Sequence, residues 1–157
     1  MAAMSRQEET HWLTKEQQHI WRQYLAATSW IDTFLEEALR PFDLGLGEYE
    51  ILVELSEAPE HRMRMSDLAA AVRQSRSRLT HTAKRLEAKK LIARGHCPDD
   101  RRGVVATLTP AGYDLLRAAA PTHVQSVRDC FIDVVPRKEF EALGRAMAAV
   151  LENKPLV

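Results

Sequence analysis

The fold of this chain is decided by residues 66–108, which read SDLAAAVRQSRSRLTHTAKRLEAKKLIARGHCPDDRRGVVATL. The pattern predicts a short helix, a tight link, a basic helix and two strands around a charged tip, at Ser66–Val72, Arg73-Gln74, Ser75–Lys90, Leu91–Arg94 and Val104–Leu108. Helix, turn, basic helix and hairpin in this order are typical of a winged helix-turn-helix, in which one helix enters the DNA major groove. We therefore predict a mainly α fold with a small β-hairpin wing.

The charge of the chain is unevenly distributed along the sequence. The 157 residues carry 22 basic and 22 acidic side chains, so the formal net charge is zero. Residues 62–102, however, hold twelve lysines and arginines against four acidic residues, and the excess of +8 is balanced by −8 elsewhere. A basic centre between acidic flanks favours a DNA-binding protein, and a solvated charged surface is the alternative interpretation.

The basic helix is predicted to have one apolar and one DNA-facing side. At 100° per residue, Leu79, Ala83 and Leu86 share the side that packs on the domain. The hydroxyl, imidazole and cationic groups of the other sides suit phosphate and base-edge contacts. The candidate DNA contacts on this helix are Ser75, Arg76, Ser77, Arg78, Thr80, His81, Lys84 and Arg85.

The hairpin tip is the second candidate DNA contact. Asp99, Asp100, Arg101 and Arg102 lie between Pro98 and Gly103, which bracket a turn. We expect Arg101 and Arg102 to reach the backbone or the minor groove, with the Asp100 carboxylate orienting Arg102. The alternative is an ordinary polar turn.

Further helices are predicted on both sides of this unit. Long apolar-striped helices are expected over Leu13–Leu39 and from Pro136 to Leu151, and shorter ones over Glu48–Ser56 and from Pro110 towards Ala120, where Pro121 interrupts or bends the chain. N-caps are expected at Thr14 (in a capping box with Gln17), Ser66, Ser75 and Thr109. The two long helices carry more apolar surface than a small winged domain covers.

Several classes of protein are disfavoured by what the sequence lacks. No apolar run reaches the length that spans a bilayer, and the first residues do not resemble a signal peptide. Two cysteines do not make a disulfide framework, so we expect a reduced, cytoplasmic protein. No nucleophile elbow, phosphate loop or zinc-protease motif is present, so we expect neither an enzyme nor a cofactor.

Residues 14 to 152 resemble the MarR family of bacterial transcriptional regulators. The resemblance rests on an ordered set of segments: Ser75-Arg76-Ser77-Arg78-Leu79-Thr80, Arg85-Leu86-Glu87, Leu91-Ile92, the wing signature Asp100-Arg101-Arg102, and Leu108-Thr109-Pro110-Ala111-Gly112. One departure is Lys90, at a position where the family often has a glycine. A lysine there makes the left-handed helix end less favourable than a glycine would.

The resemblance implies a homodimer that binds a pseudo-palindromic operator. The chain would be a single domain over residues 1–157, with a winged-helix part at about 45–109 and dimerisation helices at about 12–40 and 110–152. Two recognition helices would meet half-sites about one DNA turn, ~34 Å, apart. It also implies a repressor that a small, often aromatic effector releases, for which Trp21, Trp30, Phe34 and Tyr49 are the candidate contacts.

Three alternatives remain open at this point. A redox sensor would use Cys97, whose cationic neighbours could lower its pKa, or Cys130. A metal sensor would need further ligands beside His96 and Cys97, or beside His123 and Cys130, and we predict no metal site. A winged helix that docks another protein would not need arginines on both the basic helix and the wing.

Overall fold

The computed structural model describes residues 10–97 and 100–153, without the side chains of Cys97 and residues 100–102. Its elements in chain order are α1 Lys15–Leu39, η1 Arg40–Phe42, α2 Leu46–Glu57, η2 Pro59–His61, β1 Arg62–Arg64, α3 Met65–Ala71, α4 Arg76–Ala88, β2 Ile92–Cys97, β3 Asp100–Leu108, α5 Pro110–Val127, the π-turn η3 Arg128–Ile132 and α6 Arg137–Glu152. The predicted fold class, mainly helical with a small wing, is confirmed.

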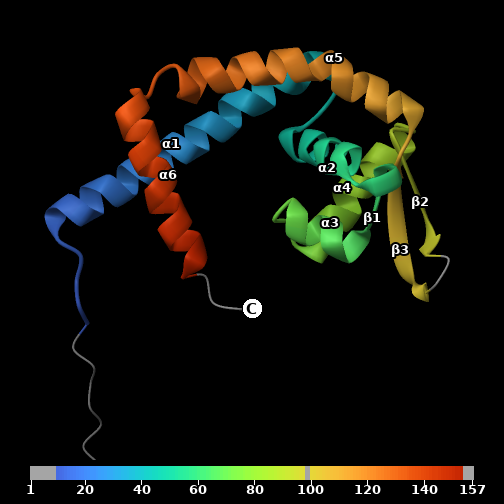
Figure 1. Ribbon diagram of the computed structural model, residues 1–157, viewed down its shortest axis with the longest axis horizontal. Helices are drawn as coiled ribbons and strands as arrows, with labels where there is room; N and C mark the ends of the chain where they lie inside the picture. Colours follow the sequence, from blue (N-terminus) through green and yellow to red (C-terminus); the bar gives the residue numbers. More distant parts are fainter. Residues whose placement is uncertain (1–9, 98–99, 154–157) are drawn as a thin grey trace, which may run out of the picture.

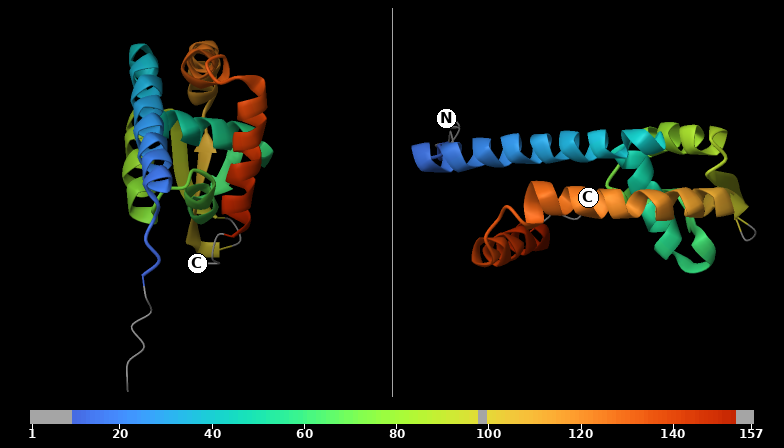
Figure 2. Two further views of the ribbon diagram at one scale, coloured as in Figure 1. Left: turned by 90° about the vertical axis from the view of Figure 1, so that its left-hand side faces the viewer. Right: turned by 90° about the horizontal axis from the view of Figure 1, so that it is seen from above.

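The molecule has a winged-helix body at one end and a helical arm at the other (Figure 1). Helices α2, α3 and α4 and the sheet form the body, while α1 and α5 extend away from it side by side (Figure 2). Helix α6 follows α5 at the end of the arm far from the wing. The arm therefore leaves the basic helix α4 and the wing accessible at the opposite end.

The wing is part of a three-stranded antiparallel sheet with strand order β1-β3-β2. Met63 of β1 pairs with Ala106, and Gly95 of β2 pairs with Val105. The hairpin strands are longer than the sequence predicts, and β1, whose three residues are Arg62-Met63-Arg64, was not predicted. So short a strand has no detectable periodicity, and it exists because β3 offers it a hydrogen-bonding edge.

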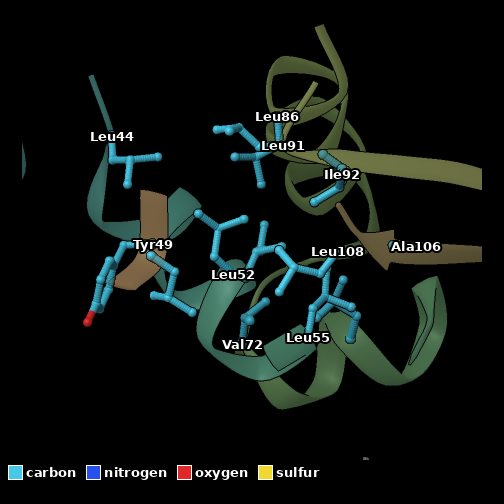
Figure 3. Close-up of a cluster of buried hydrophobic side chains, with 14 of the residues drawn as sticks. Leu44, Tyr49, Leu52, Leu55, Val72, Leu86, Leu91, Ile92, Ala106 and Leu108 are labelled. Carbon is cyan, nitrogen blue, oxygen red and sulfur yellow. The ribbon is translucent and has the colours of Figure 1, made fainter. Parts of the chain in front are cut away.

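The core lies between α2, α4 and the sheet (Figure 3). Leu52 and Leu55 of α2 are fully buried there, close to Leu86 and Ile92. The predicted apolar side of α4 is confirmed, since all three residues assigned to it, Leu79, Ala83 and Leu86, are at most 1% exposed. Burying a leucine side chain contributes roughly 2 kcal/mol, so these contacts set which side of α4 faces outward.

Most of the predicted helix boundaries are confirmed. The Thr14 hydroxyl accepts from Gln17 N at 3.1 Å and the Gln17 side chain accepts from Thr14 N, which completes the capping box. Ser75 caps α4 by accepting from Arg78 N at 3.2 Å. Lys90 adopts the left-handed conformation, with φ of 61°, that a glycine would adopt at lower cost.

The structure corrects the expected helix boundaries at two places. Ser66 lies inside α3, whose N-cap residue is Arg64, and its hydroxyl donates to the Asp67 carboxylate at 3.3 Å instead of capping. At Pro121, where an interruption or a bend was expected, the interruption does not occur, because α5 continues to Val127. Proline removes one amide donor from the helix, and α5 tolerates this loss because Pro121 and Arg117, whose carbonyl loses that donor, both lie at an exposed surface.

The start of α5 is attached to the residue that precedes β2. Thr109 Oγ1 donates to Leu91 O at 3.0 Å and accepts from Gly112 N at 3.0 Å. Gly112, in the first turn of α5, lies very close to the backbone of Leu91. A β-carbon on Gly112 would be only 2.1 Å from Leu91 O. The Leu-Thr-x-x-Gly segment therefore needs threonine for the attachment and glycine for the close approach.

We expect Gly112→Ala to destabilise the protein by about 3 kcal/mol, because the backbone of α5 or of Leu91 must move to remove the overlap. Thermal unfolding followed by circular dichroism measures the effect. Gly95→Ala is the control, since no atom lies within 4 Å of its β-carbon position. Equal melting temperatures for the two variants would show that α5 is not packed this closely.

Candidate nucleic-acid interface

Helix α4 presents most of its polar residues to solvent, although Thr82 is buried. Each of the eight candidate contacts on this helix is exposed: Ser75, Arg76, Ser77, Arg78, Thr80, His81, Lys84 and Arg85. Three of them also serve the helix itself. Ser75 is the N-cap, Thr80 Oγ1 donates to Arg76 O at 2.8 Å, and Arg85 makes an ion pair.

Cations without carboxylate partners remain on this face. Within the described part of the chain, no acidic side chain pairs with Arg76 or Lys84. His81 likewise has no hydrogen-bond partner among these residues. Fixed cations without internal partners attract phosphate, because ion pairing with the ligand then displaces no bond inside the protein.

A groove separates α4 from the wing. It has a volume of about 290 Å³ and is lined by Arg64, Met65, Ser66, Arg76, Leu79, Thr80, Gly103 and Val104. Arg64 comes from β1, so sequence reasoning missed this side of the groove. The basic pair around Met63 was the only signal, and its position became clear only once β1 paired with β3.

Near the C-terminal end of α4, Arg85 is held by the buried carboxylate of Glu48, a residue of α2. Glu48 is 4% exposed, and its two oxygens accept from Arg85 Nε and Lys89 Nζ, at 3.2 Å each. Glu48 also accepts from Gly45 N at 3.0 Å, which completes a capping arrangement at the start of α2. Arg85 therefore connects α4 to α2, a role that its place on the helix surface did not reveal.

A second ion pair connects α4 to the wing. The Glu87 carboxylate accepts from Arg94 Nε and Nη2, at 3.1 and 2.7 Å, and from Arg94 N at 3.1 Å. These hydrogen bonds, together with the positive charge of Arg94, hold the pKa of Glu87 below its usual range. Because Arg94 lies in β2, the pair orients the hairpin relative to the recognition helix.

The wing-tip predictions fall mainly outside the described part of the structure. The backbone of Asp100, Arg101 and Arg102 belongs to β3, but their side chains lie outside the described residues. Their expected roles, phosphate or minor-groove contact for the arginines and orientation for Asp100, remain predictions.

The four candidate effector contacts do not come together in one place. Trp21 stacks on Tyr24 and Trp30 packs against Phe34, with ring centres 5.6 and 5.4 Å apart. Trp21, Trp30 and Phe34 lie on α1 with more than a third of their surface exposed. Tyr49 is buried instead, and its ring centre lies 4.3 Å from that of His123 on α5.

Tyr49 and His123 belong to a cavity of about 240 Å³ where α1, α2, the end of α3 and α5 meet. Its lining comprises Asp32, Leu35, Leu46, Tyr49, Glu50, Val53, Glu54, Ala71, Val72, Arg73 and His123. Burial raises the pKa values of Tyr49 and Glu50 and lowers that of His123. Sequence reasoning named only Tyr49 as an effector contact here, because the other lining residues come from four separate elements.

Many large apolar side chains are exposed on the arm. On α1 and just before it these are Trp12, Leu13, Ile20, Trp21, Tyr24, Leu25, Trp30 and Phe34, and on α5, α6 and the turn between η3 and α6 they include Val124, Val134, Phe140, Met147, Val150 and Leu151. Exposed apolar area of this extent marks an association surface. No described helix is long and apolar enough to cross a membrane.

The cysteines and histidines form no obvious sensor in the described residues. Cys130 is a free, buried thiol, and burial raises its pKa, which is the opposite of what a reactive cysteine needs. The side chain of Cys97 lies outside the described part of the chain. Among the described residues, no group of three or more His, Cys, Asp or Glu side chains is placed to hold a metal ion.

Comparisons with known proteins relate the chain to transcriptional regulators. The MarR family model matches residues 44–104. The crystal structure of AbsC, a MarR family transcriptional regulator from Streptomyces coelicolor, matches with a TM-score of 0.86 and 45% identity, over 91% of this chain and 97% of that chain. Sco3205, another from Streptomyces coelicolor, crystallised in complex with DNA, matches with a TM-score of 0.89 and 38% identity, over 94% of each chain.

A more distant match concerns the fold alone. CouR from Rhodococcus jostii RHA1, crystallised with p-coumaroyl-CoA bound, is 19% identical, with a TM-score of 0.74. The alignment covers 88% of this chain and 95% of that one.

We expect Glu87→Gln to lower the melting temperature at neutral pH, because the amide cannot form the ion pair with Arg94. The folded-state pKa of Glu87 is depressed, so its stabilisation is present above the ordinary glutamate range and is lost as pH falls through the folded value. Melting curves from neutral to acidic pH should therefore converge for the two proteins. Glu57→Gln, at an exposed position, is the control, and a difference that does not depend on pH would contradict this account.

Proposed function

Because this chain belongs to the MarR family of transcriptional regulators, we propose that it binds a specific pseudo-palindromic operator as a homodimer and represses transcription until a small effector releases it. The observation that carries this proposal is the exposed polar face of α4, on which Arg76 and Lys84 have no partner among the described residues. The DNA complex of Sco3205, a relative that is 38% identical, supports it.

Each candidate contact has a distinct role in this proposal. The residues expected to face the major groove are Ser77, Arg78, Thr80, His81, Lys84 and Arg85, of which Arg85 would also keep its bond to Glu48. Lys84 would contact a phosphate there, and Ser75 and Arg76 would contact phosphate or a base edge at the helix start. Arg101 and Arg102 of the wing would reach the backbone or minor groove.

Dimer formation would use the apolar side chains of the arm. Burying an exposed tryptophan or phenylalanine contributes roughly 2 kcal/mol, so the tryptophans of α1 and the apolar stripe of α6 supply enough surface for a stable association. The body with α4 stays free at the other end of each protomer (Figure 1). Two copies would then present two recognition helices to half-sites about one DNA turn, ~34 Å, apart.

The regulatory part of the proposal concerns the effector and the direction of control. Repression is the expected outcome when a bound dimer blocks a promoter. Binding of p-coumaroyl-CoA by CouR is an example of a ligand held by this fold, although the low identity carries no residue contacts to this chain. Of the four effector contacts expected from the sequence, Tyr49 has the strongest support, because it lines a cavity. We propose no enzymatic activity.

We expect Lys84→Ala to weaken binding to the operator and to random DNA by similar factors, because a lysine that contacts phosphate carries no sequence information. The slope of log affinity against log salt should become less steep by about 1 for each protomer. Fluorescence anisotropy with a labelled duplex from the promoter region of the gene, titrated at several salt concentrations, measures both quantities.

Arg117→Ala is the matched control for this experiment. Arg117 is an exposed cation on α5, outside the basic segment, so its removal should leave the salt slope unchanged. Equal slopes for Lys84→Ala and the unmodified protein would remove this lysine from the interface. Absence of binding to either duplex at low salt would contradict the proposed function as a whole and favour a winged helix that docks another protein.

We expect Arg102→Ala to weaken operator binding by about tenfold, a loss of ~1.4 kcal/mol, while the dimer and its melting temperature stay nearly unchanged. The wing arginine would act only in the complex, so its removal should not affect folding. Anisotropy titration and thermal unfolding of the same preparation measure the two properties. Unaltered operator affinity would exclude the Arg102 side chain from DNA recognition.

A further inference from the structure

The cavity next to Tyr49 carries an excess of negative charge. Asp32, Glu50 and Glu54 line it together with a single cation, Arg73. Arg73 Nη2 is 3.8 Å from Glu50 Oε1, and no cation pairs with Asp32 or Glu54 among the described residues. Burial is the largest cause that raises the pKa of Glu50. The charges of Asp32 and Glu54 raise this pKa further, and the positive charges of Arg73 and Arg78 oppose the increase.

Two polar groups without partners complete the lining. Tyr49 is only 5% exposed, and no group of the described residues bonds its hydroxyl, which points away from the apolar core (Figure 3). His123 Nδ1 is buried and also has no hydrogen-bond partner. A buried polar atom without a partner is unfavourable, so His123 Nδ1 favours a ligand that forms a hydrogen bond with it, and the water-accessible Tyr49 hydroxyl is available for a second one.

We propose that this cavity binds a small organic cation, an aromatic or heteroaromatic ring that carries an amidinium or ammonium group. The cationic N–H groups would pair with the Glu50 and Glu54 carboxylates, and the ring would lie among Leu35, Val53 and Val72. This inference rests on the effector part of the proposed function and specifies the chemical class of the effector.

The size and walls of the cavity suit a ligand with one ring. A dry cavity of about 150 Å³ is known to accept benzene, so a volume of about 240 Å³ leaves space for a ring and one charged substituent. The face of the Tyr49 ring also attracts a cation, which adds to the electrostatic preference.

An anionic ligand, such as a phenolate or a carboxylate, fits the same cavity poorly. It would meet three carboxylates, and the nearest compensating charge, Arg73, is already paired with Glu50. Burial lowers the pKa of His123, so the imidazole stays neutral and adds no positive charge at neutral pH. Like charges within a few ångströms repel each other, and this repulsion disfavours such a ligand.

The lining of the cavity includes part of the turn that leads into the recognition helix α4. Val72 and Arg73 belong to both the lining and the turn between α3 and α4, and Arg73 adopts a left-handed conformation there, with φ of 54°. A bound cation would compete with Arg73 for Glu50 and so change the turn that positions α4. We therefore expect the ligand to weaken operator binding.

Three near-isosteric probes test the chemical class: benzamidinium, benzamide and benzoate, titrated into the full-length protein by isothermal titration calorimetry. We expect benzamidinium to bind at least tenfold more tightly than either of the others, a difference of ~1.4 kcal/mol. Equal or tighter binding of benzamide or benzoate, or no binding of benzamidinium, would overturn the proposal.

Two substitutions locate the site. Glu50→Gln, which keeps the size of the side chain, should lower benzamidinium affinity at least tenfold, and Tyr49→Phe should lower it by a smaller factor. Glu57→Gln, on the exposed side of the same helix, should have no effect. Thermal unfolding checks that each variant is folded. Equal affinities for Glu50→Gln and Glu57→Gln would overturn the assignment to this cavity.

A separate measurement distinguishes failure of this inference from failure of the proposed function. Operator affinity without ligand tests DNA binding alone, and a protein that binds its operator but shows no preference for benzamidinium contradicts only this inference. Saturating benzamidinium should weaken operator binding at least fivefold, within the usual range of coupling between sites. Unchanged operator affinity would overturn the regulatory role of the cavity.

Discussion

The buried carboxylate of Glu48 seats the recognition helix on the rest of the winged-helix body. It accepts hydrogen bonds from Gly45 N at the start of α2 and from Arg85 and Lys89 near the end of α4. A buried charge costs several kcal/mol unless it is paired and hydrogen-bonded, so α4 can roll or slide only by breaking these bonds. With the end of α4 held in this way, Leu79 and Leu86 stay in the core and the opposite face stays outside.

Side-chain hydrogen bonds connect α4 to the wing and to α2. Glu87 links it to the wing through Arg94, and Glu48 links it to α2. Helix α2 is linked in turn to the arm, since the Glu36 carboxylate of α1 accepts from Leu46 N at 2.5 Å. A change at the arm or at the cavity beside Tyr49 therefore has a route of direct contacts to the recognition helix.

Local patterns predicted much of the fold because they depend on neighbouring residues only. The inward face of α4, its cap at Ser75 and the capping box at Thr14 are confirmed, since helical periodicity and capping act within one or two turns. The start of α3 was predicted wrongly, and the interruption of α5 that was one of the two outcomes expected at Pro121 does not occur. In both places the tertiary surroundings of the segment, an adjacent strand or an exposed surface, outweighed the local preference.

By itself, the sequence determined the order of the elements, the basic character of α4 and the excess of apolar surface on the terminal helices, because composition and periodicity are properties of the chain. Only the tertiary structure decided which charges are available to a partner. Arg85 and Arg76 look alike in the sequence, yet Arg85 is paired with a carboxylate 37 residues away and Arg76 is not paired with any described residue. The cavity beside Tyr49 likewise exists only because four separate elements meet there, and electrostatic interactions depend on distance in space, not along the chain.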